Sequence, residues 1–364
     1  MSTPVIDRRP ERLIPRCGFL VHNAELLFHF LPVMEQLGPE LVELVLISVD
    51  PEEERVLTQA VAHLPFPCRD ARELLLGGWG YRWLVSNHSH GAYHVAGKSF
   101  YLIRSLGQTN IRLLYDLGAD GWNYAPLNRL FDFFLCFGPW HVARLQAFEG
   151  IKLQMGCPRF DRFFTEPCAR DVQLKTFGCD PAKPVVVWFS TLRSYHGVLD
   201  RFAPAVSRLL PDYNVIVKPH PFSWQVEPDF VKALDGLRFS TVLAAPCDNV
   251  ILFQLADFVI SDYGSLPFDA LYTDRNLLLL DHPDYPGRDS DDQLICDTEQ
   301  WLRRYIPHLA CSEADQLPRY LANESIWQEQ ARRRAWLRPG FFAPYYGFAS
   351  RMAAHLLRQI MENR

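Results

Sequence analysis

The chain has 364 residues, which exceeds the usual size of a single hydrophobic core, so its length predicts two domains. Nearly half of the residues are hydrophobic and 22% are charged, a composition that excludes a disordered chain. The net charge of -5 provides no overall basic field for binding nucleic acid.

The cysteines and the N-terminus point to the cytosol. Nine cysteines are scattered through the chain without a C-x-x-C pair, which argues against a disulfide framework and against a zinc ribbon. Residues 1–16 are polar and contain no apolar signal core. No apolar run reaches the roughly 20 residues that a membrane span needs. We therefore expect a soluble, cytoplasmic protein.

The first half of the chain alternates between short apolar runs and helical stretches. The runs that resemble buried strands are residues 17–22, 41–49, 83–87, 111–115 and 132–137. Helices are expected over residues 26–36 and from about residue 52 to residue 63. This alternation is typical of a parallel α/β sheet.

A second α/β series follows a lapse in periodicity at residues 163–184, where a domain junction is predicted. The expected strands are 184–189, 214–218, 237–244, 257–261 and 276–280, and the expected helices are 198–210, 228–234 and a segment from about 298. In the final stretch, 343–361, large apolar side chains recur every fourth residue, which predicts an amphipathic helix.

The two series predict an α/β protein of two Rossmann-like, doubly wound domains that face a cleft, with a helical tail. The predicted boundaries are 1–170, 171–342 and 343–364, and the last segment is expected to pack back on the first domain. Parallel strands end at one edge of such a sheet, and ligands bind beyond that edge.

The stretch 257–269 is the first candidate for a ligand site. It combines a mostly apolar run, a polar turn that contains Ser261, Asp262, Gly264 and Ser265, and a helical segment. A strand that feeds a Gly/Ser turn and a helix aims backbone N–H groups and a positive helix end at one point, which suits a phosphate. An ordinary βα turn with a well-capped helix explains the same residues.

Two other polar segments follow strands of the same predicted sheet. In residues 218–221, Lys-Pro-His-Pro, the prolines keep His220 out of a helix. Its imidazole can donate to a phosphoryl oxygen or shuttle a proton, or it can merely cap a turn. In residues 190–194, hydroxyl groups and Arg193 can hold a diphosphate, or they can form a capped helix entry with an exposed arginine.

Histidines follow a strand of the first half. His88, His90 and His94 have an H-x-H-x3-H spacing that can indicate a metal site. However, His88 and His90 would share a strand face, whereas His90 and His94 need helical geometry to meet. We therefore expect no metal here and assign these histidines an acceptor-side or a structural role.

Several of these segments together resemble the CDP-glycerol glycerophosphotransferase family of teichoic-acid and capsule polymerases. The resemblance spans residues 111–364, and the motifs occur in the family's order. They are Gly-Cys-Pro-Arg-Phe-Asp at 156–161, Trp-Phe-Ser-Thr-Leu-Arg at 188–193, Val-Lys-Pro-His-Pro at 217–221, Ile-Ser-Asp-Tyr-Gly-Ser at 260–265 with Phe268 and Asp269, and Tyr-Gly-Phe-Ala-Ser-Arg at 346–351. These motifs only partly distinguish this family from epimerases and glycosyltransferases of the same GT-B architecture.

The resemblance implies that domain 1–170 faces the acceptor and that domain 171–342 holds a CDP-activated donor, without a further cofactor. His220 would contact the donor phosphates or assist the leaving group. Ser261, Asp262 and Ser265 would hold the diphosphate, with Arg193 nearby. The remaining residues of the predicted donor site are Ser190, Lys218, Gly264 and Asp269. A hydroxyl of a polysaccharide or lipid-linked acceptor would attack the β-phosphorus while CMP departs.

One departure from the family concerns the catalytic base. The family carries a His-Gly pair at the end of a first-domain strand, and the matching residues here are 115–118, Tyr-Asp-Leu-Gly. Asp116 serves as the base if it is partly desolvated, or His88 or His90 takes that role. Two further hypotheses stay open: a GT-B enzyme that transfers or epimerises a UDP-sugar, and a nucleotide-binding protein without activity.

Residues 332–342 bear on location because they combine arginines with large aromatic side chains. They can rest on an anionic membrane surface, or they can form a helix face with a buried aromatic anchor.

The resemblance implies two partners, a nucleotide donor and a hydroxyl acceptor. The expected location is the cytoplasm, with or without peripheral contact with the inner face of the membrane.

Overall fold

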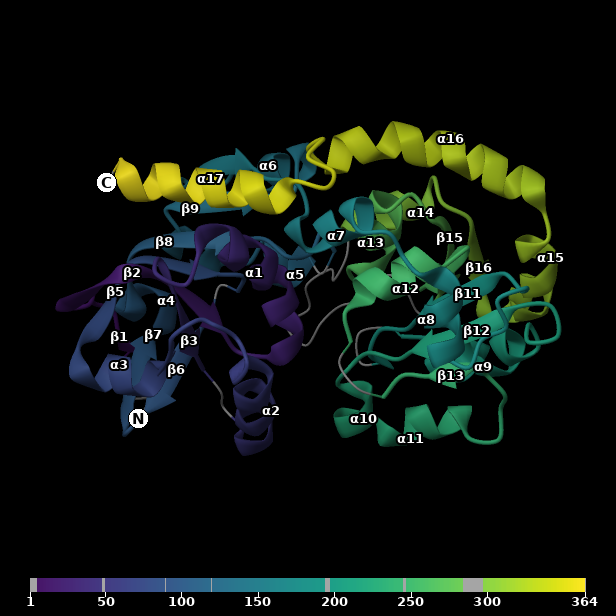
Figure 1. The fold of residues 1–364 in the computed structure, drawn as a ribbon, viewed down its shortest axis with the longest axis horizontal. Helices are drawn as coiled ribbons and strands as arrows, with labels where there is room; N and C mark the ends of the chain where they lie inside the picture. Colours follow the sequence, from purple (N-terminus) through teal and green to yellow (C-terminus); the bar gives the residue numbers. More distant parts are fainter. Residues whose placement is uncertain are drawn as a thin grey trace. The chain divides into compact units, whose positions relative to one another are not determined.

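The computed structural model describes residues 5–47, 50–88, 90–118, 120–193, 197–244, 247–283 and 297–363. These residues form two compact units, each built around a parallel β-sheet (Figure 1). Unit 1 comprises residues 1–115, 122–161 and 341–364, and unit 2 comprises residues 116–121 and 162–340. The predicted fold class, α/β with two Rossmann-like units, is confirmed.

The main sheet of unit 1 has seven strands in the order β10-β9-β8-β5-β2-β3-β4, and all neighbouring strands are parallel. The strands are β2 (Arg12–Val21), β3 (Val42–Leu46), β4 (Cys68–Asp70), β5 (Trp79–Ser86), β8 (Gly107–Leu113), β9 (Phe133–Cys136) and β10 (Ile151–Gln154). The chain builds the sheet outward from β2 in one direction and from β5 in the other. The order therefore reverses between β2 and β5, which is where ligands bind in doubly wound sheets.

A second, three-stranded sheet of unit 1 consists of β1 (Val5–Ile6), β7 (Lys98–Tyr101) and β6 (Ala92–Val95). The helices of this unit are α1 (Ala24–Leu37), α2 (Pro51–Val61), α3 (Ala71–Gly77), α4 (Leu102–Leu106), α6 (Pro139–Arg144) and α17 (Ala349–Glu362), together with the 3-10 turns η1 (Pro126–Leu130) and η2 (Pro158–Phe160). The short helix α5 (Asp120–Asn123) lies at the passage from unit 2 to unit 1.

The sheet of unit 2 has six parallel strands in the order β13-β12-β11-β14-β15-β16. The strands are β11 (Val185–Phe189), β12 (Asn214–Lys218), β13 (Thr241–Val242), β14 (Phe258–Ser261), β15 (Asn276–Asp281) and β16 (His308–Ala310). The order reverses between β11 and β14. This arrangement has the 3-2-1-4-5-6 strand order of dinucleotide-binding sheets.

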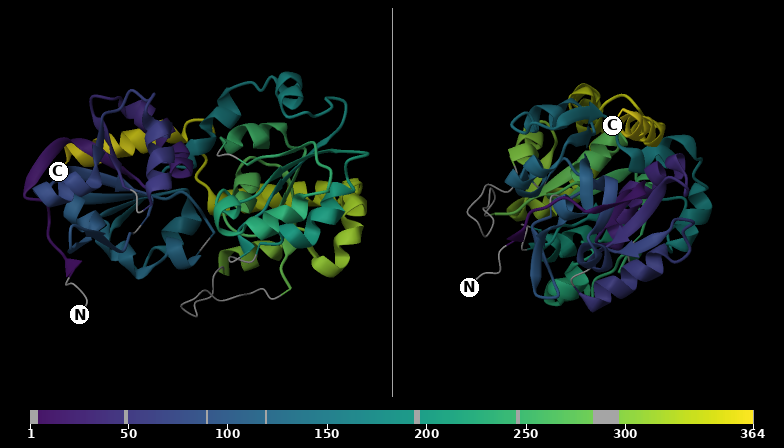
Figure 2. Two further views of the ribbon diagram at one scale, coloured as in Figure 1. Left: turned by 90° about the horizontal axis from the view of Figure 1, so that it is seen from below. Right: turned by 90° about the vertical axis from the view of Figure 1, so that its left-hand side faces the viewer.

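Helices cover both faces of the sheet of unit 2 (Figure 2). They are α7 (Asp161–Thr165), α8 (Arg170–Thr176), α9 (Leu199–Ser207), α10 (Ser223–Val226), α11 (Pro228–Val231), α12 (Asn249–Leu255), α13 (Leu266–Tyr272), α14 (Asp297–Arg303), α15 (Leu317–Leu321) and α16 (Glu324–Phe341), with 3-10 turns η4 (Lys232–Leu234) and η5 (Cys311–Gln316). Strand β11 and the middle of β15 are apolar because they are buried on both faces: all five residues of β11 and the four leucines of β15 are buried.

The structure corrects several predicted boundaries. The strand expected at 237–244 is reduced to the two residues of β13, and the short edge strands β4, β10 and β16 were not predicted. The final helix begins at Ala349 rather than at residue 343. Pro344 and Gly347 explain the late start, because Gly347 has a φ of +83°, which a helix cannot contain.

Two of the sequence motifs meet at the start of α17. Asp161, the last residue of the motif at 156–161, accepts hydrogen bonds from the backbone N–H groups of Ala349 (2.8 Å) and Ser350 (2.7 Å). These two residues belong to the motif at 346–351. The carboxylate thus caps the helix that packs against α1 and η2, with Leu357 and Ile360 among its buried residues.

Replacing Asp161 with Ala is expected to lower the free energy of unfolding by about 1–2 kcal/mol, because two amide groups at the helix start lose their acceptor. Chemical denaturation followed by circular dichroism measures the effect. Asp161→Asn is the control, since asparagine also caps helices well, and it is expected to lose less. Equal midpoints for the Ala variant and the wild type would show that the cap contributes nothing.

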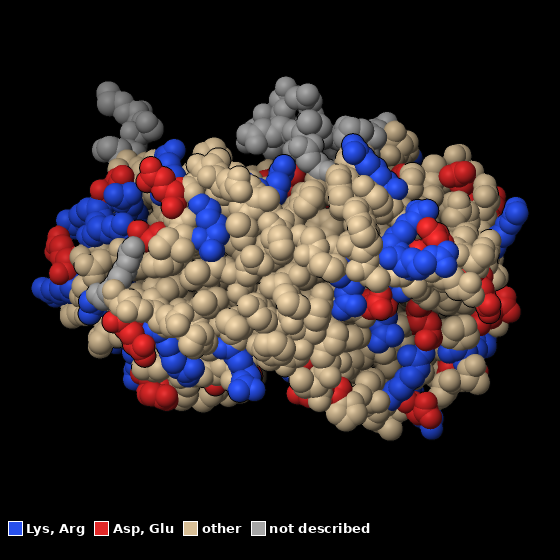
Figure 3. All heavy atoms as spheres, turned by 90° about the horizontal axis from the view of Figure 1, so that it is seen from above, with Lys and Arg blue, Asp and Glu red and all other residues tan. Residues whose placement is uncertain are grey.

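The arginine-rich segment 332–342 contains a buried aromatic anchor. Phe341 and Phe342 are buried in unit 1, against Trp140 and Phe137 respectively, whereas Trp336 on α16 is 64% exposed. Lys and Arg side chains lie among Asp and Glu side chains on the face shown in Figure 3. None of the helices in the described residues is long and apolar enough to cross a bilayer.

Candidate active site

Three polar segments end at neighbouring positions of the sheet of unit 2. Strand β11 lies between β12 and β14, so residues 190–193, 218–221 and 261–265 all follow adjacent strands at the same sheet edge. This edge includes the point between β11 and β14 where the strand order reverses. The donor residues predicted from the sequence are therefore brought to one edge of the sheet. Ser194, the last residue of the predicted segment 190–194, lies outside the described residues.

Asp262 organises this edge through the backbone. Its carboxylate is fully buried and accepts hydrogen bonds from the N–H groups of Thr191 (2.9 Å), Val198 (3.1 Å) and Tyr263 (2.8 Å). Burial raises the pKa of Asp262 to about 6, although the three backbone hydrogen bonds act in the opposite direction. A buried carboxylate with these partners fixes the loop after β11 to the loop after β14.

His220 is held as a hydrogen-bond donor. Its Nδ1 accepts a hydrogen bond from the N–H of Phe222 (3.2 Å). Burial, and then the charge of Lys218, lower the pKa of His220 to about 4, so the ring is neutral at pH 7. Because Nδ1 is an acceptor, the proton of the neutral ring must be on Nε2. His220 therefore offers an N–H group at the end of β12, where the adjacent Lys218 is also buried.

Arg193 and Ser190 have partners within unit 2. The guanidinium of Arg193 forms an ion pair with Asp200 (2.7 Å) and lies over the ring of Phe230, 4.1 Å from its centroid. Ser190 is buried, and its hydroxyl donates to the carbonyl oxygen of Thr191 (3.1 Å). These contacts make both residues part of the framework of the loop after β11.

The loop after β14 presents a half-buried serine. Ser265 precedes α13, and its side chain makes no capping hydrogen bond to that helix. Ser261, at the end of β14, and Asp269, within α13, are both buried. Of these three predicted residues, Ser265 is the one that is partly exposed, and it lies at the start of the helix.

Asp116 lies on a segment that packs against the same loop. A Cβ atom on Gly118 would lie 2.7 Å from the carbonyl oxygen of Gly264, so the two backbones are in close contact. Asp116 accepts a hydrogen bond from the N–H of Gly118 (2.7 Å). Burial raises the pKa of Asp116 to about 7, and the neighbouring charge of Asp120 adds to this rise.

Helix α14 fixes this segment. The hydroxyl of Thr298 donates to Asp120 (2.8 Å), and Glu299 accepts a hydrogen bond from the N–H of Gly264 (2.8 Å). Gly264 itself has a φ of +84°, a conformation that favours glycine. The Gly264 amide, predicted to face a phosphate, is thus bonded to a carboxylate in this structure.

The predicted histidines of the first half lie at the corresponding edge of unit 1. His88 and His90 follow β5, and His22 follows the adjacent strand β2; their ring centroids are 4.6 Å (His22–His88), 5.0 Å (His22–His90) and 5.9 Å (His88–His90) apart. The ring of Tyr115 lies 4.8 Å from that of His88. We call His22, His88 and His90 the histidine cluster.

His94 does not belong to the histidine cluster, because it lies on β6 with its Nδ1 2.6 Å from the hydroxyl of Ser99. The expectation that His88 and His90 share a strand face is wrong, since β5 ends at Ser86 and both residues are in the loop beyond it. Among the described residues, no group of three His, Cys, Asp or Glu side chains has the arrangement of a metal site.

A buried arginine holds the loop of the histidine cluster. Arg112, on β8, is fully buried and donates to the carbonyl oxygens of Asn87 (3.3 Å) and Asn123 (2.5 Å) and to the side chain of Asn128. Burial lowers its pKa to about 10. Because Asn87 directly precedes His88, Arg112 positions the segment that carries two of the histidines.

Sequence reasoning missed two contributors. His22 carries no motif of its own, and only the strand order brings it to the edge of unit 1. Arg303, on α14, contacts the ends of two strands: it pairs with Asp281 (2.7 Å) and donates to the carbonyl oxygen of Asp262 (2.7 Å). The alternation of strands and helices predicts such edges, but it does not predict which strands are neighbours.

The CDP-Glycerol:Poly(glycerophosphate) glycerophosphotransferase family model matches residues 142–333, more than half of the chain. The chain therefore belongs to this family. In this glycerophosphotransferase-family member, the match includes the loops after β11, β12 and β14, which contain the polar segments at the sheet edge of unit 2. No curated protein matches the chain significantly.

Solved structures with the same fold include the wall teichoic acid polymerase TagF, at 15% identity and a TM-score of 0.65 over 96% of this chain and 90% of that one. A putative UDP-N-acetylglucosamine 2-epimerase from Listeria monocytogenes aligns at 13% identity and a TM-score of 0.65 over 96% and 97% of the two chains. The S. aureus MnaA–UDP structure aligns at 11% identity and a TM-score of 0.62, with the same coverage. At these identities the likeness establishes the fold of the family member, which is that of GT-B proteins.

Proposed function

We propose that this family member transfers glycerol phosphate, or a similar polyol phosphate, from a CDP-activated donor to a hydroxyl acceptor during synthesis of a surface polysaccharide of the teichoic-acid type. Family membership supports the transferase class. The observation that supports the proposal is the sheet edge of unit 2, where Lys218 and His220 at the end of β12 and Ser265 after β14 lie on the two sides of β11.

On the donor side, the Nε2–H of His220, the ammonium group of Lys218 and the hydroxyl of Ser265 bind the diphosphate. Their positive charge and donor groups stabilise the negative charge that grows on the phosphate oxygens as CMP leaves. Asp262 and Arg193 are positioning residues, because the Asp262 carboxylate already accepts from three backbone N–H groups and the Arg193 guanidinium already pairs with Asp200.

On the acceptor side, Asp116 takes the proton. The acceptor oxygen forms a bond to the β-phosphorus, the bond from that phosphorus to the oxygen shared with the α-phosphorus breaks, and CMP departs with the electron pair. The acceptor proton moves to the carboxylate of Asp116. A carboxyl with a pKa raised to about 7 is suited to this task at neutral pH.

The test uses the purified full chain with CDP-glycerol, a UDP-sugar and a hydroxyl acceptor. Calorimetry is expected to show binding of CDP-glycerol, and mass spectrometry is expected to show CMP and an acceptor extended by glycerol phosphate. His220→Ala is expected to reduce the transfer rate roughly 10²–10³-fold, because a donor to the developing charge is lost. His220→Gln, which keeps an N–H donor, is expected to lose less. The proposal is contradicted if the protein does not bind CDP-glycerol and if His220→Ala is as active as the wild type.

A second candidate is a transferase or epimerase that uses a UDP-sugar. It is favoured by the fold likeness to the epimerase and to MnaA with UDP, which is about as close as that to TagF. The same product analysis separates the two, since an epimerised or transferred sugar differs in structure or mass from a glycerol phosphate adduct. Binding of a donor without any product would instead indicate a nucleotide-binding protein that has lost catalysis.

A further inference from the structure

A cavity of 420 Å³ in unit 2 is bordered by the carboxyl end of β15, by helix α14 and by the first residue of β16. None of the residues proposed to bind the donor diphosphate is among the described residues that line it. In the sheet, β15 and β16 are the third and fourth strands from β12, which carries Lys218. At about 4.8 Å between strands this is roughly 14–19 Å, far more than the length of a diphosphate. The cavity is therefore a separate place on the sheet edge.

The charges around this cavity do not cancel. Arg303 is buried and uses its guanidinium within the fold, because it pairs with Asp281 (2.7 Å) and donates to the carbonyl oxygen of Asp262 (2.7 Å). The Asp281 carboxylate is thus neutralised. Arg304, the next residue, is exposed and makes no ion pair or hydrogen bond with another described residue. Its positive charge is uncompensated and can bind an anion.

Two further polar side chains line the cavity. Gln300 lies one helical turn before Arg304, on the same side of α14, and its amide makes no hydrogen bond with another described residue. His308, at the start of β16, has its Nδ1 2.5 Å from the Asp281 carboxylate, and its Nε2 has no partner among the described residues. A guanidinium, an amide and an imidazole from two elements approach a ligand from different directions, which suits a tetrahedral oxyanion.

Protonation of His308 adds a second positive charge. The hydrogen bond to Asp281 raises the pKa of His308 above the ordinary value of 6.5. The charges of Asp281 and of Glu313 on η5 act in the same direction, whereas burial and the charge of Arg303 oppose them. The ring is therefore protonated up to a higher pH than a free imidazole, and it then donates through both nitrogens.

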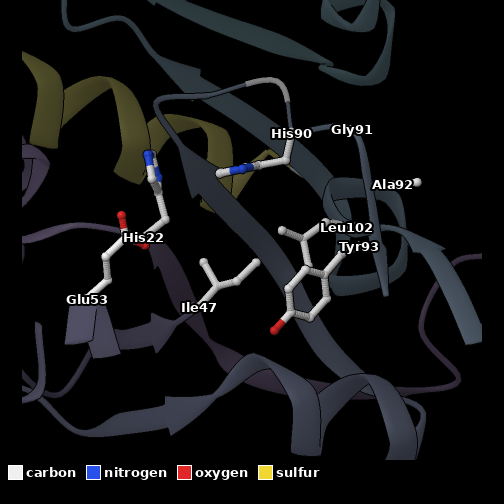
Figure 4. Close-up of a pocket in the computed structure, with 8 residues that line it drawn as sticks. All are labelled: His22, Ile47, Glu53, His90, Gly91, Ala92, Tyr93 and Leu102. Atoms are coloured by element: carbon white, nitrogen blue, oxygen red, sulfur yellow. The ribbon is translucent and has the colours of Figure 1, made fainter. Parts of the chain in front are cut away.

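A smaller cavity of 220 Å³, in unit 1, has the opposite character (Figure 4). None of the described residues that line it is a lysine or an arginine, and Glu53 contributes a carboxylate beside the apolar side chains of Ile47 and Leu102. An anion there would meet a like charge with no cation beside it. Of these two cavities, only the one in unit 2 suits an anion.

We propose that the cavity of unit 2 binds the phosphate group of a small phosphate ester, at a site separate from that of the donor diphosphate. Arg304 pairs with the phosphate, and the amide of Gln300 and the Nε2–H of protonated His308 donate to its other oxygens. The volume falls within the roughly 300–1,000 Å³ of small-molecule sites, so it holds a phosphate together with organic substituents. This inference goes beyond the proposed transferase function and does not depend on it.

A first experiment measures binding without turnover. The side-chain ¹⁵N resonances of Arg304 and His308 in the full-length protein, assigned with Arg304→Gln and His308→Gln, are followed by NMR. The titrants are a phosphodiester of two glycerol units, inorganic phosphate and glycerol. The diester is expected to shift both signals at a lower concentration than phosphate does, and glycerol is expected to shift neither.

The outcomes of this titration decide the ligand. A stronger response to inorganic phosphate than to the diester would contradict an ester ligand and assign the site to the free ion. The inference is overturned if neither anion moves the two signals, or if glycerol moves them as far as the diester does.

A second experiment compares affinities for the diester. Arg304→Gln is expected to weaken binding about 3–10-fold, because a charge-assisted hydrogen bond is lost at an exposed site. Arg304 is exposed, so the fold is expected to tolerate the change. Arg319→Gln on α15 is the matched control: Arg319 is exposed, has no ion pair with a described residue and does not line the cavity. Equal affinities for the wild type and Arg304→Gln would contradict the site.

The pH dependence tests the role of His308. The diester keeps one negative charge between about pH 5.5 and about pH 8.5, so a change in its affinity reports on the protein. The affinity of the wild type is expected to rise about 2–5-fold as the pH falls across this range, and His308→Gln is expected to abolish the rise. His220 stays neutral over the same range, because its pKa is about 4. A flat profile for the wild type would rule out His308 as a ligand.

The two proposals fail in different ways. Arg304→Gln is expected to bind CDP-glycerol as the wild type does, because the proposed donor residues lie on other strands. Equal losses of affinity for the diester and for CDP-glycerol would contradict a separate site. A wild-type protein that binds the diester in this cavity but no CDP donor contradicts the transferase proposal alone.

Discussion

Replacing Asp116 with Asn is expected to reduce the rate of polyol phosphate transfer by roughly 10²–10⁴-fold while binding of CDP-glycerol persists, because the amide cannot take the acceptor proton. Asn keeps the side-chain oxygen that accepts from the N–H of Gly118, so the local turn is retained. Steady-state rates with a fixed acceptor and calorimetry with CDP-glycerol measure the two quantities separately.

The pH profile distinguishes proton transfer from a structural role. The pKa of Asp116 is raised to about 7, so the wild-type rate is expected to fall as the pH decreases through about 7, where the carboxyl becomes protonated. Asp120→Asn is the control. Because the charge of Asp120 raises the pKa of Asp116, this variant is expected to shift the fall to lower pH without abolishing it. An Asp116→Asn variant with the wild-type profile would rule out Asp116 as the base.

Asp262→Ala is expected to produce the largest loss of stability in unit 2. The substitution leaves the N–H groups of Thr191, Val198 and Tyr263 without their acceptor, at roughly 1–3 kcal/mol for each buried group that finds no other partner. Hydrogen–deuterium exchange is expected to speed up at the amides of Thr191 and Val198 first. Unchanged exchange there would show that the carboxylate does not hold the loop.

Asp262→Asn tests the charge of the same group. The folded-state pKa of Asp262, about 6, lies above the ordinary value of an aspartate carboxyl, 3.8, so this group contributes stability below pH 3.8 and loses it as the pH rises through about 6. The wild type is therefore expected to gain stability relative to the Asn variant as the pH falls from about 6 to about 4. Denaturation midpoints of both proteins at the two pH values measure this difference, and a constant difference would contradict the pKa assignment.

Much of the fold follows from local patterns. The valines of β11 and the leucines of β15 predict strands buried on both faces, and the alternation with helices predicts parallel sheets. Parallel strands share one carboxyl edge, so the sequence predicts that the loops at 190–194, 218–221 and 261–265 lie together, and the structure has their described residues at one edge. Edge strands of two to four residues, such as β13 and β10, are too short to leave a periodic signal.

The arrangement within the site depends on contacts that the sequence does not reveal. Ser and Asp in the turn after β14 suggest groups that face a phosphate, but the Asp262 carboxylate binds three backbone amides and the Gly264 amide binds Glu299. The guanidinium of Arg193 pairs with Asp200 and lies over the ring of Phe230, both in the same unit. His22 joins the histidine cluster only because β2 and β5 are neighbours in the sheet, which is a property of strand order rather than of any motif.

The capping of α17 by Asp161 has a consequence for the synthesis of the chain on the ribosome. Unit 2 is complete in sequence at residue 340, whereas unit 1 needs residues 341–364, including the helix that packs on α1. The N-terminal unit is therefore completed after the C-terminal one, and its α1 face stays uncovered until α17 has been synthesised. A nascent chain stalled after residue 340 is expected to contain a folded C-terminal unit and an N-terminal unit that still binds chaperones.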